Sequence, residues 1–331
     1  MAKRIDYIDT TKAIGILLMI LGHCQYIGNI PGLSRLVYSF HMPLFFIISG
    51  MFIKPLCLYE SLGKYSKAYL QPYVVTCLLM LVLTIVLSLV SVWNFAEHVI
   101  TALKSYIFAS GSNLGTAYLH DFPKVGMIWF LFALFWGCLF YSLIKKYTKN
   151  TFQQLFLTFF LFTIGYITGK YIRLPFSIQS GMCAVIYIMT GDVIKKNEVV
   201  ERITNDSWFF STLLIFMWIT SALLLGGINM ACNSYTEGLI QVPVSIIATL
   251  VVSMLCFKCR FKIGWLGKNT LAILVGHQLF KSYCWQTSFD FDRIMPILPP
   301  PRCANFGIFH SSVYSCYHWL IGEESEINIR I

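Results

Sequence analysis

The sequence predicts an all-α fold, a polytopic transmembrane helical bundle of about ten helices. Of its 331 residues, 57% are hydrophobic and only 12% are charged, whereas a soluble domain has roughly 45–50% apolar and about 25% charged residues. The mean hydropathy is +0.68. So few charges cannot coat a water-soluble body of this size. Soluble enzymes, nucleic-acid-binding proteins, disordered scaffolds and secreted disulfide domains are therefore poor interpretations.

Apolar runs close to the length that crosses a bilayer mark the expected spans. An interfacial helix is expected at residues 95–108, in the longer mixed segment 94–124. We find no internal repeat and no soluble domain, so residues 1–331 are expected to form one integral-membrane domain, with 291–331 as a divergent tail. The expected spans are residues 13–30, 36–53, 73–93, 125–144, 152–172, 180–194, 208–225, 239–257 and 266–285, with a weak tenth at 306–321.

The basic residues set the expected orientation. The net charge of +10 comes from 25 Lys and Arg against 15 Asp and Glu. Basic clusters at residues 3–12, 54–67, 145–149, 195–202 and 258–262 fall on one side of the membrane if every span is real. This pattern predicts a multi-pass protein of the cytoplasmic (inner) membrane with a cytoplasmic N-terminus, and no nucleic-acid partner.

Metal binding is not expected from the cysteines. Most of the 11 cysteines are scattered singly through apolar runs. Cys256 and Cys259 have CxxC spacing, but no second pair or histidine follows at zinc-finger distance. We interpret the cysteines as inert thiols.

Asp9, Lys12 and His23 form a stripe on the first helix. Lys12 and His23 are 11 residues apart, which at about 100° per residue returns to the same face within roughly 20°. His23 then lies roughly 16 Å deeper than Lys12. Ionisable groups at membrane depth are costly and usually have a function, so all three residues are candidate catalytic residues. His23 would act as the base that takes the proton of a hydroxyl. The alternative is a juxtamembrane cap and anchor beside a packing histidine.

The second span offers another imidazole, His41, as a further catalytic candidate. Two antiparallel neighbouring helices would present His23 and His41 at comparable depth. Pro43 is expected to kink this helix and open a cavity. The alternative for His41 is a helix-start residue in a wet interface. We interpret Ser49 and Gly50 as a site of close helix packing rather than as a nucleophile.

Lys64 and Lys67 precede the third span and are candidate cofactor-binding residues. Residues at i and i+3 share a helix face, so their two ammonium groups could hold phosphates by charge. The alternative is an ordinary positive-inside cluster.

These residues resemble the membrane-bound acyltransferase 3 family, and within it the branch of sugar and polysaccharide O-acetyltransferases that includes fucose-acetylase-like proteins. The resemblance covers residues 4–280, and its specific part is the first two spans. The motifs that carry it are Arg4-Ile-x-x-x-Asp9-x-x-Lys12, Lys12-x10-His23, Ser39-Phe-His41-Met-Pro-Leu-Phe-Phe-Ile-Ile-Ser-Gly50, Trp129-Phe-Leu131, Gly191 before Lys195-Lys196, and Gly264-Trp-Leu-Gly-Lys-Asn-Thr-Leu271 leading to His277.

The resemblance implies O-acyl transfer from acetyl-CoA, or a similar acyl-CoA, on the cytoplasmic side. The acceptor would be a hydroxyl of a carbohydrate or lipid-linked glycan used in surface polysaccharide synthesis. His23 would be catalytic, Lys12 would fill the family's Arg/Lys position at the donor, and Asp9 would be its acidic partner. Many members have Arg-x-x-Arg where this chain has Lys64-x-x-Lys67, and lysine cannot reproduce the paired contacts of a guanidinium with a phosphate.

Two other function classes also fit a polytopic membrane protein. A transporter or flippase for a small solute or lipid-linked sugar often shows matching halves, and this sequence shows none. A polysaccharide polymerase usually has a large outer loop, and segment 94–124 is modest for that. The expected partners of an acyltransferase are acyl-CoA, a glycan acceptor and membrane lipid, with no metal; the oligomeric state stays open.

Overall fold

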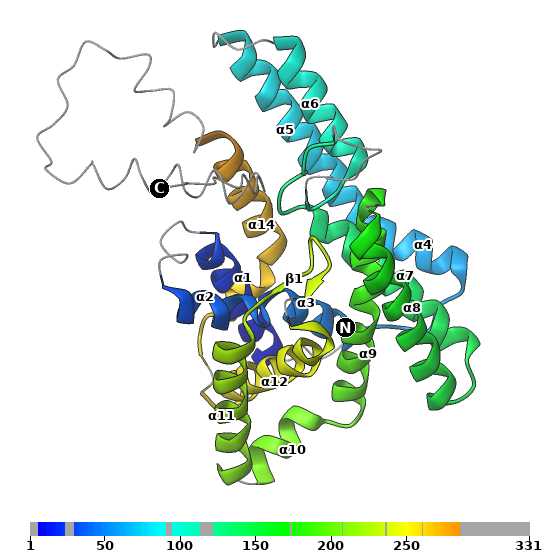
Figure 1. The fold of residues 1–331 in the computed structure, drawn as a ribbon, viewed down its shortest axis with the longest axis vertical. Coiled ribbons are helices and arrows are strands. Elements are labelled where there is room, and N and C mark those ends of the chain that lie inside the picture. Colours follow the sequence, from blue (N-terminus) through cyan, green and yellow to red (C-terminus); the bar gives the residue numbers. More distant parts are fainter. Residues whose placement is uncertain are drawn as a thin grey trace, which may run out of the picture. The chain divides into compact units, whose positions relative to one another are not determined.

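The computed structural model describes residues 6–23, 30–90, 95–112, 122–172, 174–206, 208–235, 237–259 and 261–284. Most of these residues are helical (Figure 1), which confirms the predicted all-α fold class. The described residues up to Tyr283 belong to one compact unit. The predicted tenth span at 306–321 and the divergent tail at 291–331 lie outside the described residues.

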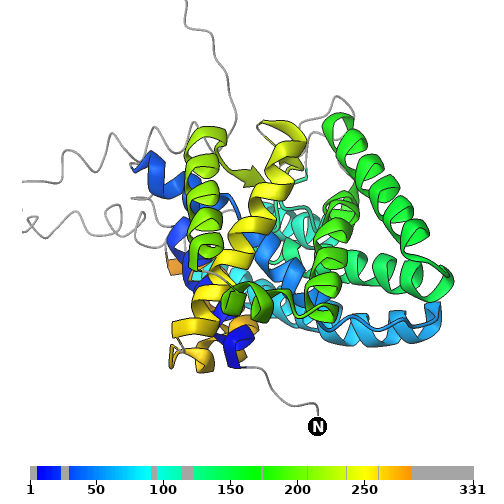
Figure 2. The same cartoon turned by 90° about the horizontal axis from the view of Figure 1, so that it is seen from below.

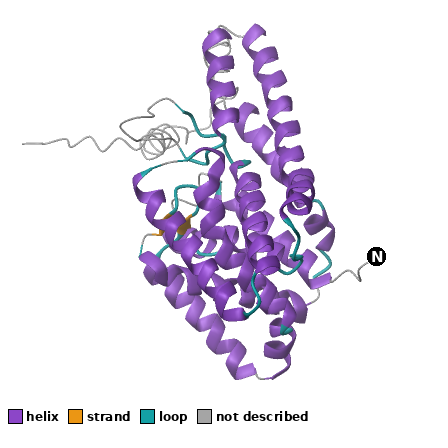
Figure 3. Cartoon of the chain, turned by 90° about the vertical axis from the view of Figure 1, so that its right-hand side faces the viewer, coloured by secondary structure: helices purple, strands orange, loops and turns teal. Residues whose placement is uncertain are grey.

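The helices and the one short hairpin follow each other along the chain. They are α1 (Asp6–Gly22), α2 (Pro31–Tyr38), α3 (His41–Gly50), α4 (Leu58–Tyr65), a π-helical segment η2 (Ser66–Leu70), α5 (Gln71–Val90), α6 (Phe95–Phe108), α7 (Trp129–Tyr147), α8 (Thr151–Tyr171), a 3₁₀ turn η3 (Pro175–Ser177), α9 (Ile178–Lys196), α10 (Val199–Asp206), α11 (Trp208–Leu225), strands β1 (Ile228–Asn229) and β2 (Ser234–Tyr235), a 3₁₀ turn η4 (Gly238–Ile240), α12 (Gln241–Cys259), α13 (Gly264–Lys268), α14 (Thr270–Leu279) and a π-helical segment η5 (Phe280–Cys284). The two strands, drawn in orange in Figure 3, pair antiparallel, with Ile228 opposite Tyr235.

Six helical segments of the described part are long and apolar enough to cross a membrane. They are Leu58–Leu89, Trp129–Tyr147, Thr151–Tyr171, Pro175–Lys196, Trp208–Leu225 and Gly238–Cys259. These segments overlap the third to eighth predicted spans. The helix expected at residues 95–108 is also present, as α6, and it packs beside α5.

The prediction that the second span is one continuous helix is wrong. Residues 36–53 are broken between α2 and α3, where Phe40 has φ −152° and ψ −15°. Pro43 explains the break, since proline has no N–H to donate to the carbonyl four residues back and its ring would clash there. In the first turn of a new helix the missing N–H costs nothing.

The ninth predicted span is also interrupted, between α13 and α14 at Asn269. Its side-chain Nδ2 donates to the carbonyl of Trp265 at 2.8 Å and its backbone N–H to that of Leu266 at 3.0 Å. Asparagine favours such local bonds over a continuing helix. The first predicted span, 13–30, begins earlier than expected, because α1 starts at Asp6; residues 24–29 are not described.

Glycines bring α9 into contact with α3. A Cβ atom at Gly50 would lie 1.9 Å from the carbonyl oxygen of Ile188, and one at Gly191 would lie 1.8 Å from that of Ile47. Each helix thus places a glycine against the backbone of the other, as small residues allow in membrane bundles. The close-packing interpretation of Gly50 is confirmed.

Helix α9 also packs against α7 and α8, while α11 and α12 lie side by side (Figure 2).

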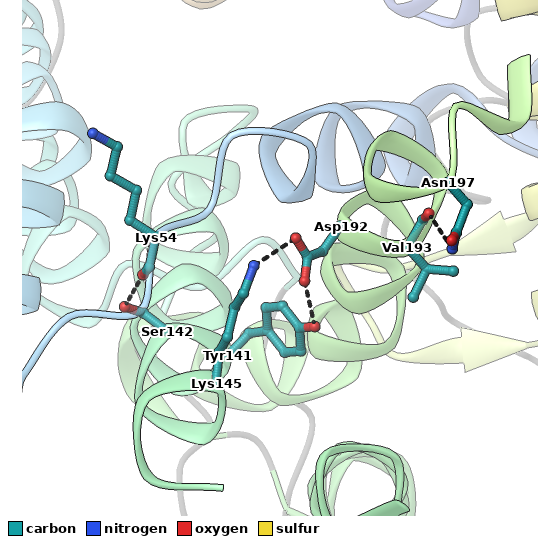
Figure 4. A network of polar contacts seen from close by, with 7 residues as sticks. All are labelled: Lys54, Tyr141, Ser142, Lys145, Asp192, Val193 and Asn197. Carbon is teal, nitrogen blue, oxygen red and sulfur yellow. Dashed lines mark hydrogen bonds and ion pairs between the residues drawn. The ribbon is translucent and has the colours of Figure 1, made fainter. Parts of the chain in front are cut away.

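A polar network joins α7 to α9 and to the segment after α3 (Figure 4). Asp192 of α9 accepts a hydrogen bond from Tyr141 at 3.0 Å and pairs with Lys145 Nζ at 2.6 Å. Ser142 donates to the carbonyl of Lys54 at 2.7 Å. Because the side chains of Lys145 and Asp192 are only 24% and 18% exposed, this ion pair is far less screened than a surface pair.

Candidate active site

One face of α1 lines a cavity of about 200 Å³. Its lining residues on this helix are Lys12, Ile16, Met19 and His23, which follow one another at the i, i+4, i+7 and i+11 positions. This spacing keeps side chains on one helix face. The structure thus places Lys12 and His23 on a common cavity. The other walls come from α3, η2, α7 and α14, and most of them are apolar.

The order of contacts along α1 shows how its neighbours run. Gly15 faces Leu44 of α3, and the hydroxyl of Tyr38 donates to the carbonyl of Gly22 at 2.6 Å. The segment formed by α2 and α3 is therefore antiparallel to α1. The segment formed by α13 and α14 runs parallel to α1, because Gly267 lies against Asp9 and His277, further along the chain, lies against His23. The cavity thus has a Lys12 end and a His23 end.

The Lys12 end holds an ion pair. Lys12 Nζ lies 3.5 Å from Asp9 Oδ1, and the Lys12 side chain is 28% exposed while that of Asp9 is 8% exposed. The ammonium group also lies 5.9 Å from the centre of the Phe52 ring. A cation held in this way can bind an anionic group at this end of the cavity.

The His23 end holds a pair of imidazoles. The rings of His23 and His277 are stacked, with centroids 6.0 Å apart and planes inclined by 30°. His277 lies on α14, whose residues Thr270 and Leu274 line the cavity. In the sequence, His277 stands out only as the end of one motif that resembles the family, and nothing there places it beside His23. Since no local spacing relates two helices so far apart in the chain, only the fold could show this pair.

Two lysines lie near the imidazole end. Lys124 and Lys281 are within electrostatic reach of His23, as is the ring of His41. Lys124 belongs to the loop before α7, and burial lowers the pKa of its ammonium group. These positive charges disfavour the protonated form of His23, so the ring stays neutral and can act as a base.

His41 lies near His23 but is absent from the described lining of the cavity. Its ring is buried, with Nδ1 2.9 Å from the carbonyl oxygen of Val37. Since a carbonyl only accepts, Nδ1 carries the proton. The Tyr38 ring packs edge-on against it at 5.0 Å. His41 therefore ties the start of α3 to the end of α2.

Lys64 and Lys67 lie outside the cavity as the structure describes it. Lys64 Nζ lies 5.0 Å from the centre of the Tyr65 ring, and Lys67 borders a shallow surface hollow with Gln71. Ala68 and Tyr69, which follow Lys67 in the π-helical segment η2, do line the cavity. π-helical turns are frequent at functional sites because the extra residue redirects side chains.

Comparison with known proteins identifies the family. No curated protein and no solved structure matches this chain. The family model described as an acyltransferase domain matches residues 5–317, nearly the whole length. The chain therefore belongs to the acyltransferase 3 family, and it is an integral-membrane acyltransferase.

Proposed function

We propose that this protein is an O-acyltransferase that moves an acetyl group from acetyl-CoA to a hydroxyl of a sugar, in a surface polysaccharide or its lipid-linked precursor. The N-terminus and the Lys12 end of the cavity would face the cytoplasm, across the inner membrane. The observation that carries this proposal is that a single cavity contacts both Lys12 and His23.

The length of the cavity fits the donor. Lys12 and His23 are separated by roughly 16 Å along the axis of α1. The phosphopantetheine arm of CoA is about as long as an extended peptide of four to five residues, or roughly 16 Å. A diphosphate beside Lys12 would therefore place the thioester at His23. Lys64 and Lys67, outside the cavity, would attract the one remaining phosphate, the 3′-phosphate of CoA.

The two ends of the cavity separate the two substrates. The donor would enter past Lys12 and lie along the face of α1 up to His23. The acceptor would therefore approach His23 from the end opposite Lys12.

The chemistry follows from the position of the imidazole. A ring nitrogen of neutral His23 takes the proton of the sugar hydroxyl while its oxygen attacks the thioester carbonyl carbon. The tetrahedral intermediate then collapses with cleavage of the C–S bond. The imidazolium of His23 returns its proton to the departing CoA thiolate, so the products are the O-acetyl ester and CoA, and the enzyme is unchanged.

The test is acetyl transfer by the purified protein in proteoliposomes. With acetyl-CoA and a glycan acceptor, we expect free CoA and ester-linked acetyl groups to appear in equal amounts. His23→Gln is expected to lower turnover by about 10²–10⁴-fold, the usual contribution of a general base. His98→Gln, on α6 and outside the described cavity lining, is the matched control. Full turnover by His23→Gln, or glycan uptake without release of CoA, would refute the proposal.

A further inference from the structure

We propose that His277 is a second catalytic residue, whose Nε2–H donates a hydrogen bond to the oxyanion of the tetrahedral intermediate. This inference rests on the proposed acyl transfer and adds a role for a residue on α14. It starts from the stacked rings of His23 and His277, 6.0 Å apart.

His277 is not part of the described cavity lining, but it lies on the face of α14 that lines the cavity. Thr270 and Leu274 line the cavity, and His277 lies seven residues after Thr270, which brings it back to the same face within roughly 20°. The stripe on α14 thus ends in an imidazole beside the imidazole that ends the stripe on α1.

Nε2 of His277 is buried and has no hydrogen-bond partner among the described residues. A buried polar atom left without a partner typically costs about 1–3 kcal/mol. Such an atom, in a ring stacked on the cavity-lining His23, is explained if a bound substrate or intermediate supplies the missing acceptor.

The position of His277 is fixed by the next residue. Gln278 Oε1 accepts from the backbone N–H of Met127 at 2.7 Å, and its Nε2 donates to Ser282 at 3.0 Å. Gly126 permits this approach, because its φ is +84° and a Cβ atom there would collide with the Gln278 amide. Preorganised donors of this kind stabilise charge without reorganising during the reaction.

The two imidazoles cannot share the role of base. In a site of low dielectric, two rings at this distance do not both accept a proton readily, and Lys124 and Lys281 add positive charge nearby. When His23 takes the proton of the hydroxyl, His277 stays neutral. As the carbonyl π electrons move onto oxygen, the Nε2–H of His277 donates to that oxygen, and no proton is transferred from it.

The test compares His277→Gln with His277→Asn and His277→Leu in the proteoliposome assay. Glutamine can place an N–H near the Nε2 position, whereas asparagine cannot reach it. We expect kcat to fall by about 10²–10³-fold in the Leu and Asn variants, the cost of one oxyanion donor, with both KM values changed by less than about threefold. His277→Gln should keep kcat within roughly tenfold of wild type.

Several outcomes would overturn this role. They are a kcat of His277→Leu within threefold of wild type, a Gln variant as slow as the Asn variant, or an acceptor KM that rises while kcat is unchanged. If His277→Leu fails to insert, the Gln and Asn pair gives the same answer. A wild-type protein without transfer activity would refute the proposed function and this role with it, whereas the outcomes above refute this role alone.

Discussion

Replacing Gly50 with alanine is expected to force α3 and α9 apart. The new Cβ atom would lie 1.9 Å from the carbonyl oxygen of Ile188, so the helices must separate by about 1.5 Å to reach ordinary contact distance. The obstacle is backbone, which cannot rotate away as a side chain can. Overpacking of a core costs 1–3 kcal/mol and sometimes more, and we expect about 3 kcal/mol here, against a gain of at most about 1 kcal/mol in helix propensity.

Gly191→Ala should cost about as much, because its Cβ atom would lie 1.8 Å from the carbonyl oxygen of Ile47 at the same crossing. Once one substitution has separated the helices, the second meets less resistance. The double variant should therefore lose clearly less than the sum of the two single losses.

The assay is reversible unfolding in mixed detergent micelles. Gly63→Ala is the control, since a Cβ atom at this helical position meets nothing within 4 Å, and it should be neutral or slightly stabilising. A loss below about 0.5 kcal/mol for Gly50→Ala, or strictly additive losses in the double variant, would refute the described crossing.

Three further substitutions test other parts of the structure. Asp192→Leu leaves Lys145 and Tyr141 without their acceptor and should cost roughly 1.5–3 kcal/mol of unfolding free energy, measured in the same micelles; an unchanged stability would contradict the network. Gly267→Ala would place a Cβ atom 1.7 Å from the carbonyl oxygen of Asp9 and so displace α1. Both the free energy of unfolding and the affinity for acetyl-CoA, measured by calorimetry, should fall. An unchanged affinity would show that Asp9 is not part of the donor site. Lys12→Met should weaken acetyl-CoA binding by about tenfold or more, while the same change at an exposed lysine should not; equal affinities would remove Lys12 from the donor site.

The long apolar helices could be predicted from the sequence because hydrophobic length is a local property. The predicted span 208–225 coincides with α11 (Trp208–Leu225). The breaks near Ser39 and Asn269 were not expected, since a proline or asparagine within an apolar run can either kink a helix or end it. The β1–β2 hairpin was not expected either, because two-residue strands have almost no sequence pattern.

The candidate site shows the same division. The Lys12–His23 stripe depends only on helical periodicity within α1, and the structure places both residues on one cavity. The contact of His23 with His277 depends on which helices become neighbours, as does the hydrogen bond of His41 to Val37. Neither contact has a spacing that a single sequence reveals.

A structure of the protein with a non-hydrolysable acetyl-CoA analogue tests the donor site and the role of His23 most directly. We expect the pantetheine arm in the cavity lined by Lys12 and His23. The carbonyl carbon of the acetyl group should lie within about 5 Å of a ring nitrogen of His23, close enough for a hydroxyl oxygen to bridge them. An acetyl group bound elsewhere, with the cavity left to lipid or water, would contradict both assignments.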